Sequence, residues 1–69
     1  ILAWSMYVEQ EDGTFRVHLR SKGPTVNHIA QAFGGGGHTH ACGIPSVTNT
    51  QITEVDTELK ETVRNFKKN

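Results

Sequence analysis

The first third of the chain carries the hydrophobic pattern of two paired β-strands. Residues 1–10 are rich in apolar and aromatic side chains, and residues 15–20 alternate strictly between apolar and polar positions. Asp12 and Gly13 stand between the two stretches, and this dipeptide is typical of a two-residue type I′ turn. We therefore predict a β-hairpin.

A two-residue turn also predicts the register of this hairpin. It would place Val8 opposite Val17 and Met6 opposite Leu19 on the core side, with Trp4 nearby. The pairs expected on the opposite, polar face are Glu9–Arg16, Tyr7–His18 and Ser5–Arg20. Each of these pairings is chemically favourable, which supports the predicted register.

The middle of the chain has the periodicity of a short amphipathic helix after the break at Gly23-Pro24. Its apolar face is formed by Val26, Ile29, Ala30 and Phe33, spaced at i, i+3, i+4 and i+7. Thr25 is placed to cap the helix at its start, and Gly34 is placed just past its end. Residues 38–43 are ambiguous between a helical turn and the approach to a strand.

Two further elements complete the expected fold. Residues 44–48 read as a strand, which Pro45 confines to an edge or to its first residues. Residues 53–56 resemble a capping box at the start of the longest helix. The apolar positions of that helix are Val55, Leu59, Val63 and Phe66. The order strand, strand, helix, glycine loop, strand, helix predicts an α+β fold, with a small mixed sheet opened by a β-hairpin and two helices on one face.

The four consecutive glycines Gly34, Gly35, Gly36 and Gly37, followed by His38, are the most unusual stretch. Glycine loses more backbone entropy on folding than any other residue and has no side chain to bury. The run lies between two apolar segments, where a flexible linker would carry polar residues instead. We interpret it as a loop whose bare amides allow a ligand to approach the backbone closely.

Length, charge and composition exclude several classes of function. Its 69 residues form one domain with a thin core, and its start at Ile1 inside an apolar run suggests a domain of a larger protein. Seven basic and seven acidic residues give no net charge, which argues against broad, non-specific nucleic-acid binding. No apolar run could cross a membrane, and Cys42 is the only cysteine, so we expect a reducing, cytoplasmic setting without a membrane partner.

The residues that favour a binding site are the glycine run, His38, Arg20 and Ser21. Arginine presents a planar set of donors that matches phosphate, and glycine amides add uncharged donors. His38 could donate to a phosphate oxygen or stack on a base. Together they predict a small anion or nucleotide site rather than a basic surface.

Two other chemistries are weaker alternatives. His38, His40 and Cys42 would share one face of a strand and could contribute to a zinc site, although no second pair of ligands has finger spacing. Cys42 could act as a nucleophile, but a buried thiol that fills space is the commoner role. No cluster of Asp and His could hold two catalytic metal ions, so we expect no catalysis, no catalytic residue and no metal in this chain alone.

Three segments together resemble a known family. They are Leu19-Arg20-Ser21, then Val26-Asn27-x-Ile29-Ala30-x-x-Phe33, then Gly34-Gly35-Gly36-Gly37-His38-x-x-Ala41-x-Gly43. This pattern resembles the C-terminal DHH-associated domain of DHH-family phosphoesterases, above all the bacterial nanoRNase group, which are oligoribonucleases and 3′-phosphoadenosine 5′-phosphate phosphatases. The resemblance covers Ile1 to Gly43 and extends plausibly to the end. Cys42 replaces an alanine common in the family.

The resemblance implies a division of labour. An N-terminal DHH domain of the same protein would hold manganese and cleave the phosphodiester, while residues 1–69 would bind short RNA or DNA oligonucleotides or a nucleoside bisphosphate. Arg20, with Ser21, would then hold a phosphate, and the glycine loop and His38 would contact the nucleotide. Two rivals remain open at this point: a nucleic-acid-binding module related to the C-terminal domain of alanyl-tRNA synthetases, and a small zinc-stabilised interaction domain.

Overall fold

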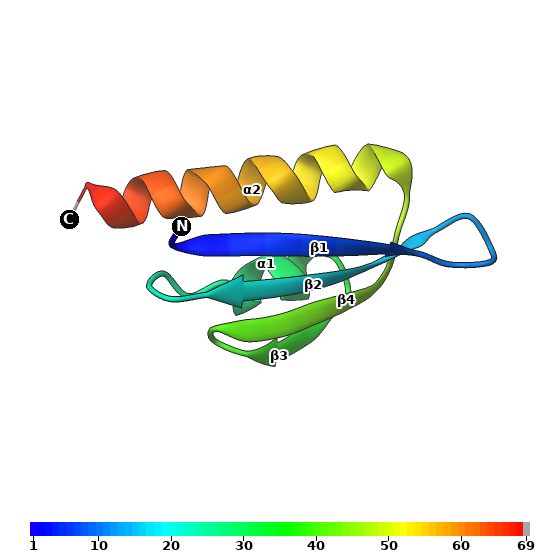
Figure 1. The fold of residues 1–69 in the computed structure, drawn as a ribbon, viewed down its shortest axis with the longest axis horizontal. Coiled ribbons are helices and arrows are strands. Elements are labelled where there is room, and N and C mark those ends of the chain that lie inside the picture. The colour runs from blue at the N-terminus through cyan, green and yellow to red at the C-terminus, as the bar shows by residue number, and fades with distance from the viewer. Residues whose placement is uncertain (69) are drawn as a thin grey trace.

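Six elements make up the fold in the computed structural model, which describes residues 1–68. They are β1 (Ala3–Glu9), β2 (Phe15–Ser21), α1 (Asn27–Ala32), β3 (Gly36–His38), β4 (Ala41–Val47) and α2 (Asn49–Lys67). The four strands form one sheet in the order β1-β2-β4-β3 (Figure 1). Every neighbouring pair is antiparallel, whereas the sequence predicted a mixed sheet. The predicted α+β class is confirmed.

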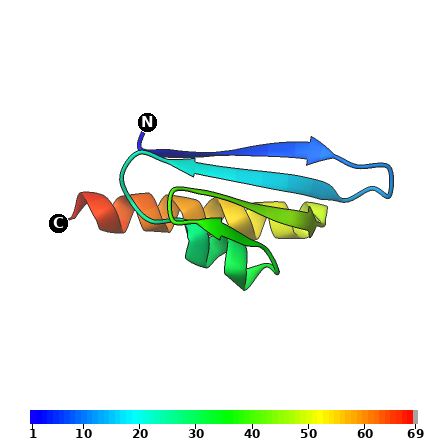
Figure 2. The ribbon, with the colours of Figure 1, turned by 90° about the horizontal axis from the view of Figure 1, so that it is seen from below.

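Both helices cover the same face of the sheet, as predicted (Figure 2). The buried side chains that fill this layer are Val17, Leu19, Val26, Ile29, Ala30, Cys42, Ile44, Val47, Val55 and Leu59. Burial of such a continuous apolar layer is the main source of stability for a domain of this size. Neither helix of residues 1–68 covers the opposite face of the sheet, and we call it the open face.

The β-hairpin is confirmed, but its turn is longer than predicted. The Gln10 amide donates to the Thr14 carbonyl at 2.8 Å, and the Gly13 amide donates to the Gln10 carbonyl at 3.1 Å. Gly13 has a φ of +87°, so it is the left-handed third residue of a three-residue loop rather than part of a two-residue turn. Hydrogen bonds from the Thr14 hydroxyl and amide hold the pKa of Asp12 below its usual value and fasten the loop.

The extra loop residue makes the predicted register wrong by one residue. The pairs observed on the core face are Tyr7–Val17 and Ser5–Leu19. A shift of one residue turns every side chain of a strand to the other face. Met6 and Val8 are therefore 46% and 51% exposed on the open face instead of buried in the core. Trp4 lies on the open face with them, opposite Arg20.

Helix α1 ends as predicted but begins differently. Its N-cap is Val26, with no side-chain hydrogen bond, so the expected cap at Thr25 is wrong. At the other end Gly34 has a φ of +87° and donates to the Gln31 carbonyl, while Gly35 donates to the Ala30 carbonyl at 2.7 Å. These two bonds form a Schellman motif, for which glycine is the preferred residue.

The glycine run is partly a strand rather than a loop. Gly36 to His38 form β3, which pairs with Ala41 to Gly43 of β4. Strand β4 therefore begins three residues before the predicted strand, and its interior contains Pro45. The proline is tolerated because β3 ends before it, and because a bulge between Phe15 and Val17 interrupts the β2–β4 ladder beside it.

Helix α2 starts five residues before the predicted capping box. Thr48 is its N-cap, and the Thr48 hydroxyl accepts from the Gln51 amide at 3.3 Å while the Gln51 side chain accepts from the Thr48 amide at 2.9 Å. Thr48-x-x-Gln51 is itself a capping box, so the earlier of two candidate boxes is used. Neither helix of residues 1–68 combines the length and apolar character needed to traverse a bilayer.

Replacing Thr48 by alanine should therefore destabilise the protein, whereas Thr53→Ala should not. Loss of an N-cap side chain costs about 1 kcal/mol. The Thr53 side chain is exposed inside α2, and only its carbonyl accepts a hydrogen bond, from Thr57. Thermal unfolding of the two variants measures the difference. A larger loss of stability for Thr53→Ala would contradict the observed start of the helix.

Candidate functional site

The open face carries a row of side chains that crosses all four strands. Strand pairing aligns Trp4 of β1, Arg20 of β2, Ala41 of β4 and His38 of β3. Arg20 and His38 were predicted from sequence to lie in one site, and the sheet places them on the same face with only Ala41 between them. The row therefore brings together a guanidinium, an imidazole and an indole around one small residue.

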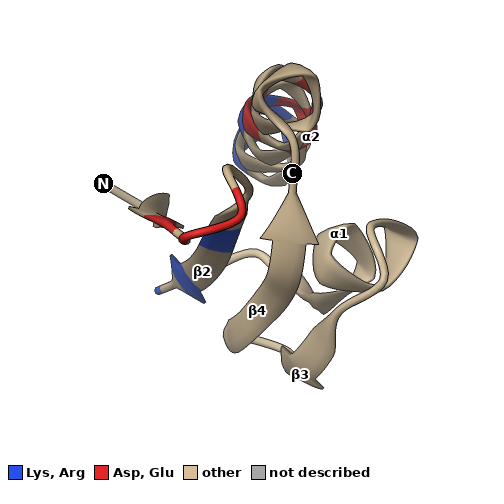
Figure 3. Cartoon of the chain, turned by 90° about the vertical axis from the view of Figure 1, so that its right-hand side faces the viewer, with Lys and Arg blue, Asp and Glu red and all other residues tan. Residues whose placement is uncertain are grey.

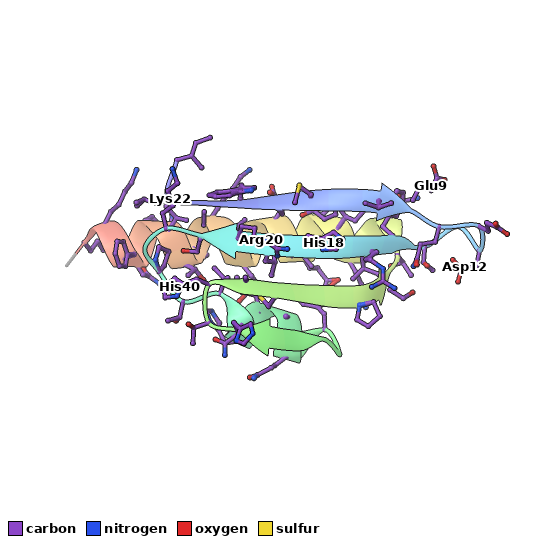
Figure 4. All side chains as sticks on the ribbon, turned by 60° about the horizontal axis from the view of Figure 1, so that its bottom comes forward. Glu9, Asp12, His18, Arg20, Lys22 and His40 are labelled. Carbon is purple, nitrogen blue, oxygen red and sulfur yellow. The ribbon has the colours of Figure 1, made fainter. Side chains whose placement is uncertain are left out.

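A second row lies two residues along the strands. It consists of Met6, His18, Gly43 and Gly36, again from β1, β2, β4 and β3. Because the last two members have no side chain, the sheet is hollowed there, and a depression of about 440 Å³ results. Figure 4 shows Arg20 and His18 following one another along β2 on the face turned away from the helices.

The open face is cationic although the chain as a whole is neutral. Residues 23–53 contain no Lys, Arg, Asp or Glu, so α1, β3 and β4 carry no such charge (Figure 3). The strand residues of the hairpin that face the open side are Trp4, Met6, Val8, Arg16, His18 and Arg20. Among the described strand residues of this face there is therefore no carboxylate to neutralise Arg16 and Arg20, which favours an anion there.

Arg20 is held in place by its own sheet. Its Nη1 donates to the Leu19 carbonyl at 2.9 Å and to the Cys42 carbonyl at 3.3 Å, so the half-buried guanidinium is directed from β2 toward β4. A guanidinium has five N–H donors in a planar arrangement, and these bonds use only Nη1. A fixed guanidinium loses little entropy when it binds a phosphate, so Arg20 is prepared for bidentate binding.

The predicted glycines divide into two groups. A Cβ on Gly35 would lie 2.1 Å from the Gly43 carbonyl oxygen, and one on Gly37 would lie 2.8 Å from the Cys42 Cα. These two glycines, like Gly34 at the end of α1, are required by the fold itself. A Cβ on Gly36 would meet nothing within 4 Å, and its φ is not in the left-handed region, so neither close contacts nor backbone conformation explain a glycine at this position.

Ser21 does not join the other predicted residues. It follows Arg20 on β2, so its side chain points away from the open face. The Ser21 hydroxyl donates to the Pro24 carbonyl at 2.5 Å and accepts from the Gly23 amide at 3.0 Å. These bonds shape the turn that leads from β2 to α1, which explains a serine at this position without a ligand.

The residues of the zinc and nucleophile alternatives do not converge. His38 lies on the open face, Cys42 faces the core, and the His40 ring contacts the Gly23 carbonyl and the Thr39 hydroxyl in the β3–β4 turn. Within residues 1–68 no three His, Cys, Asp or Glu side chains are grouped to hold a metal ion. Burial raises the pKa of the Cys42 thiol and so disfavours the reactive thiolate, although the nearby Arg20 acts in the opposite direction.

Sequence reasoning missed five members of the two rows. His18 was placed on the polar face but not in the site, Ala41 and Gly43 entered only as part of the family motif, and Trp4 and Met6 were assigned to the core. A tight hairpin with its turn at residues 39–40 would have paired His38 with Ala41 and therefore Gly36 with Gly43. Gly43 could have been found from the sequence only by recognising this hairpin. Trp4 depended on the register, which the turn length decides.

A profile of the DHHA1 domain matches residues 1–65 of the chain. A probable bifunctional oligoribonuclease and PAP phosphatase NrnA of Streptococcus mutans is 38% identical over 64 residues, which are 93% of this chain and 21% of that protein. The bifunctional oligoribonuclease and PAP phosphatase NrnA of Mycoplasma genitalium is 40% identical over 52 residues, or 75% of this chain and 16% of that protein. The corresponding protein of Bacillus subtilis is 49% identical over 43 residues, or 62% of this chain and 13% of its own length.

The chain thus spans about a fifth or less of the length of these relatives. The matched segment nevertheless includes nearly every residue of the sheet and both helices. The resemblance that the Arg20 and polyglycine segments indicated is confirmed. The chain belongs to the DHHA1 domain family.

Proposed function

We propose that this domain is the substrate-binding lobe of a DHH-family phosphoesterase that degrades short oligonucleotides or dephosphorylates nucleoside bisphosphates. In this proposal the open face binds the substrate, Arg20 holds a phosphate, and His38 and Gly36 contact the nucleotide. The lobe would work in a cytoplasmic protein by positioning the substrate, since holding a reactant in the correct geometry lowers the barrier of a reaction performed elsewhere.

One observation carries the proposal: an anchored guanidinium and an imidazole share the open face of the sheet. The described strand residues of that face include no carboxylate, and the face contains a hollow lined by glycines. Phosphate is recognised by arginine, and a flat base can lie on a surface without side chains or stack on an aromatic ring. The small number of cations suits a ligand of a few nucleotides rather than a long strand, whose binding uses many phosphate contacts.

The proposal assigns manganese and bond cleavage to an N-terminal DHH domain of the same protein. The described residues do not fit a metal of this kind, because no three His, Cys, Asp or Glu side chains among them are grouped to hold an ion. The contribution of this chain to hydrolysis would therefore be binding and orientation alone.

The rival function, a nucleic-acid module related to alanyl-tRNA synthetase, receives less support. Three similar proteins carry the name oligoribonuclease and PAP phosphatase, and the DHHA1 profile spans the residues of the open face. A tRNA end would also be expected to need a more extensive basic surface than two arginines provide.

Titration of the ¹⁵N-labelled, folded chain with adenosine 3′,5′-bisphosphate tests the proposal. We expect weak, saturable amide shifts centred on Arg20, His38 and Ala41, because these residues belong to the first row of the open face. Adenosine without phosphate serves as the control and should bind far more weakly. A folded chain that shows no saturable shifts with the bisphosphate would contradict the proposed function.

A further inference from the structure

We propose that Arg16 and His18 form a second nucleotide subsite on the open face, which binds the next nucleotide of a short single-stranded oligonucleotide. The subsite would lie over the hollow floored by Gly36 and Gly43, beside the Arg20 row. This inference rests on the proposed function and extends it, since it makes the ligand an oligonucleotide rather than a single nucleotide.

The first support is the shape of the hollow. It is lined by Arg16 and His18 of β2, by Gly43–Pro45 of β4 and by Gly34–Gly36. Gly35 and Gly37 are explained by contacts within the fold, but a Cβ on Gly36 would meet no atom of residues 1–68 within 4 Å. A flat base placed there would lie on peptide groups, and the half-buried His18 ring would contact its edge.

The second support is the spacing of the cationic side chains along β2. Residues on one face of a strand advance by about 6.6 Å for each two positions. This step is close to the step between successive phosphates of an extended single strand. Arg20, His18 and Arg16 therefore form a line along β2 that an oligonucleotide backbone can follow. Figure 4 shows the first two of them, Arg20 and His18.

The third support is the charge around Arg16. The two ion pairs among the described residues, Lys60–Asp56 and Arg64–Glu61, both lie on α2, and the neighbour of Arg16 on β1 is the apolar Val8. Arg16 is exposed and thus available to a phosphate.

Acidic residues lie at one end of the line formed by Arg20, His18 and Arg16, which we call the track. Beyond Arg16 the hairpin carries Glu9, Glu11 and Asp12, and Figure 4 shows Glu9 and Asp12 at its far end. The lowered pKa of Asp12 keeps this carboxylate ionised, so a further phosphate would meet negative charge. The track is therefore suited to an oligonucleotide of two or three residues and not to a longer strand.

The test compares two ligands on the folded chain: adenosine 3′,5′-bisphosphate and the 5′-phosphorylated trinucleotide of adenylate. We expect the trinucleotide to shift the amides of Arg16, His18 and Gly43 in addition to those of the Arg20 row, whereas the bisphosphate shifts mainly the latter. Arg16→Gln should weaken trinucleotide binding by about tenfold, the value of one charge-assisted contact, and bisphosphate binding by less than about twofold.

Arg64→Gln removes the same charge from α2 and is the matched control, for which we expect no change with either ligand. An identical footprint for the two ligands, or equal losses of both affinities in Arg16→Gln, would overturn the second subsite while leaving the proposed function intact. Absence of binding by the bisphosphate would instead overturn the proposed function, and this inference with it.

Discussion

Arg20→Ala is expected to weaken the binding of adenosine 3′,5′-bisphosphate by roughly 10- to 150-fold. A hydrogen bond to a charged group contributes about 1.5–3 kcal/mol, and each 1.4 kcal/mol is tenfold in Kd. The effect should be large because Arg20 is the cation of the first row, and because Nη1 is already fixed on the Leu19 and Cys42 carbonyls. The Kd values are measured by following amide shifts of the variant and the parent chain.

Lys22→Ala is the control for loss of charge alone. Lys22 is exposed in the turn after β2, where its backbone amide, and not its side chain, bonds to the Leu2 carbonyl at 2.7 Å. We expect its affinity to change by less than about twofold, since an exposed charge acts weakly at a distance in salt. Unchanged binding by a folded Arg20→Ala variant would remove Arg20 from the site.

Gly35→Ala should destabilise the protein strongly, although it adds only one methyl group. The new Cβ would lie 2.1 Å from the Gly43 carbonyl oxygen and 2.8 Å from the Ile44 Cα, both of which are backbone atoms that cannot rotate away. Overpacking costs 1–3 kcal/mol even where side chains can adjust, so we expect a loss of about 3 kcal/mol. In a domain of this size each kcal/mol lowers Tm by about 4–8 °C.

Gly36→Val provides the contrast to this variant. Its Cβ meets nothing within 4 Å and the backbone φ is not in the left-handed region, so the Tm should stay within a few degrees of the parent value. Its side chain would nevertheless fill the hollow of the open face, and nucleotide binding should fall. Differential scanning calorimetry and the amide-shift titration together measure both effects. A Gly36→Val variant that is strongly destabilised yet binds normally would make this glycine structural.

Local sequence determined which elements form, because their signals act over a few residues. Strict alternation produced β2, the i, i+3, i+4, i+7 spacing produced α1, and Gly34 ended that helix through a left-handed cap. Where two local signals competed, the pattern was insufficient. Thr48 and Thr53 both begin a capping box, and the earlier one is used because Val47 has completed β4 immediately before it.

The hairpin shows most clearly what local sequence signals leave undetermined. Asp12-Gly13 fits a two-residue turn and also the last two positions of a three-residue loop, and both give plausible cross-strand pairs. The observed loop puts Tyr7 in contact with the core and Met6 and Val8 on the surface. One residue of turn length therefore decided the composition of the open face.

Sequence by itself thus determined the α+β class and the family, and it predicted Arg20, His38 and the glycines as candidate site residues, since these depend on residue type and spacing. Only the tertiary structure decided that Gly35 and Gly37 are required by close contacts while Gly36 is not, because their approach to Gly43 and Cys42 is a contact with β4. It also decided that His18, Gly43 and Trp4 lie on the open face with Arg20 while the Ser21 side chain does not. The physical reason is that a sheet face is assembled from cross-strand neighbours, and their register depends on turns and bulges that no periodicity along one strand encodes.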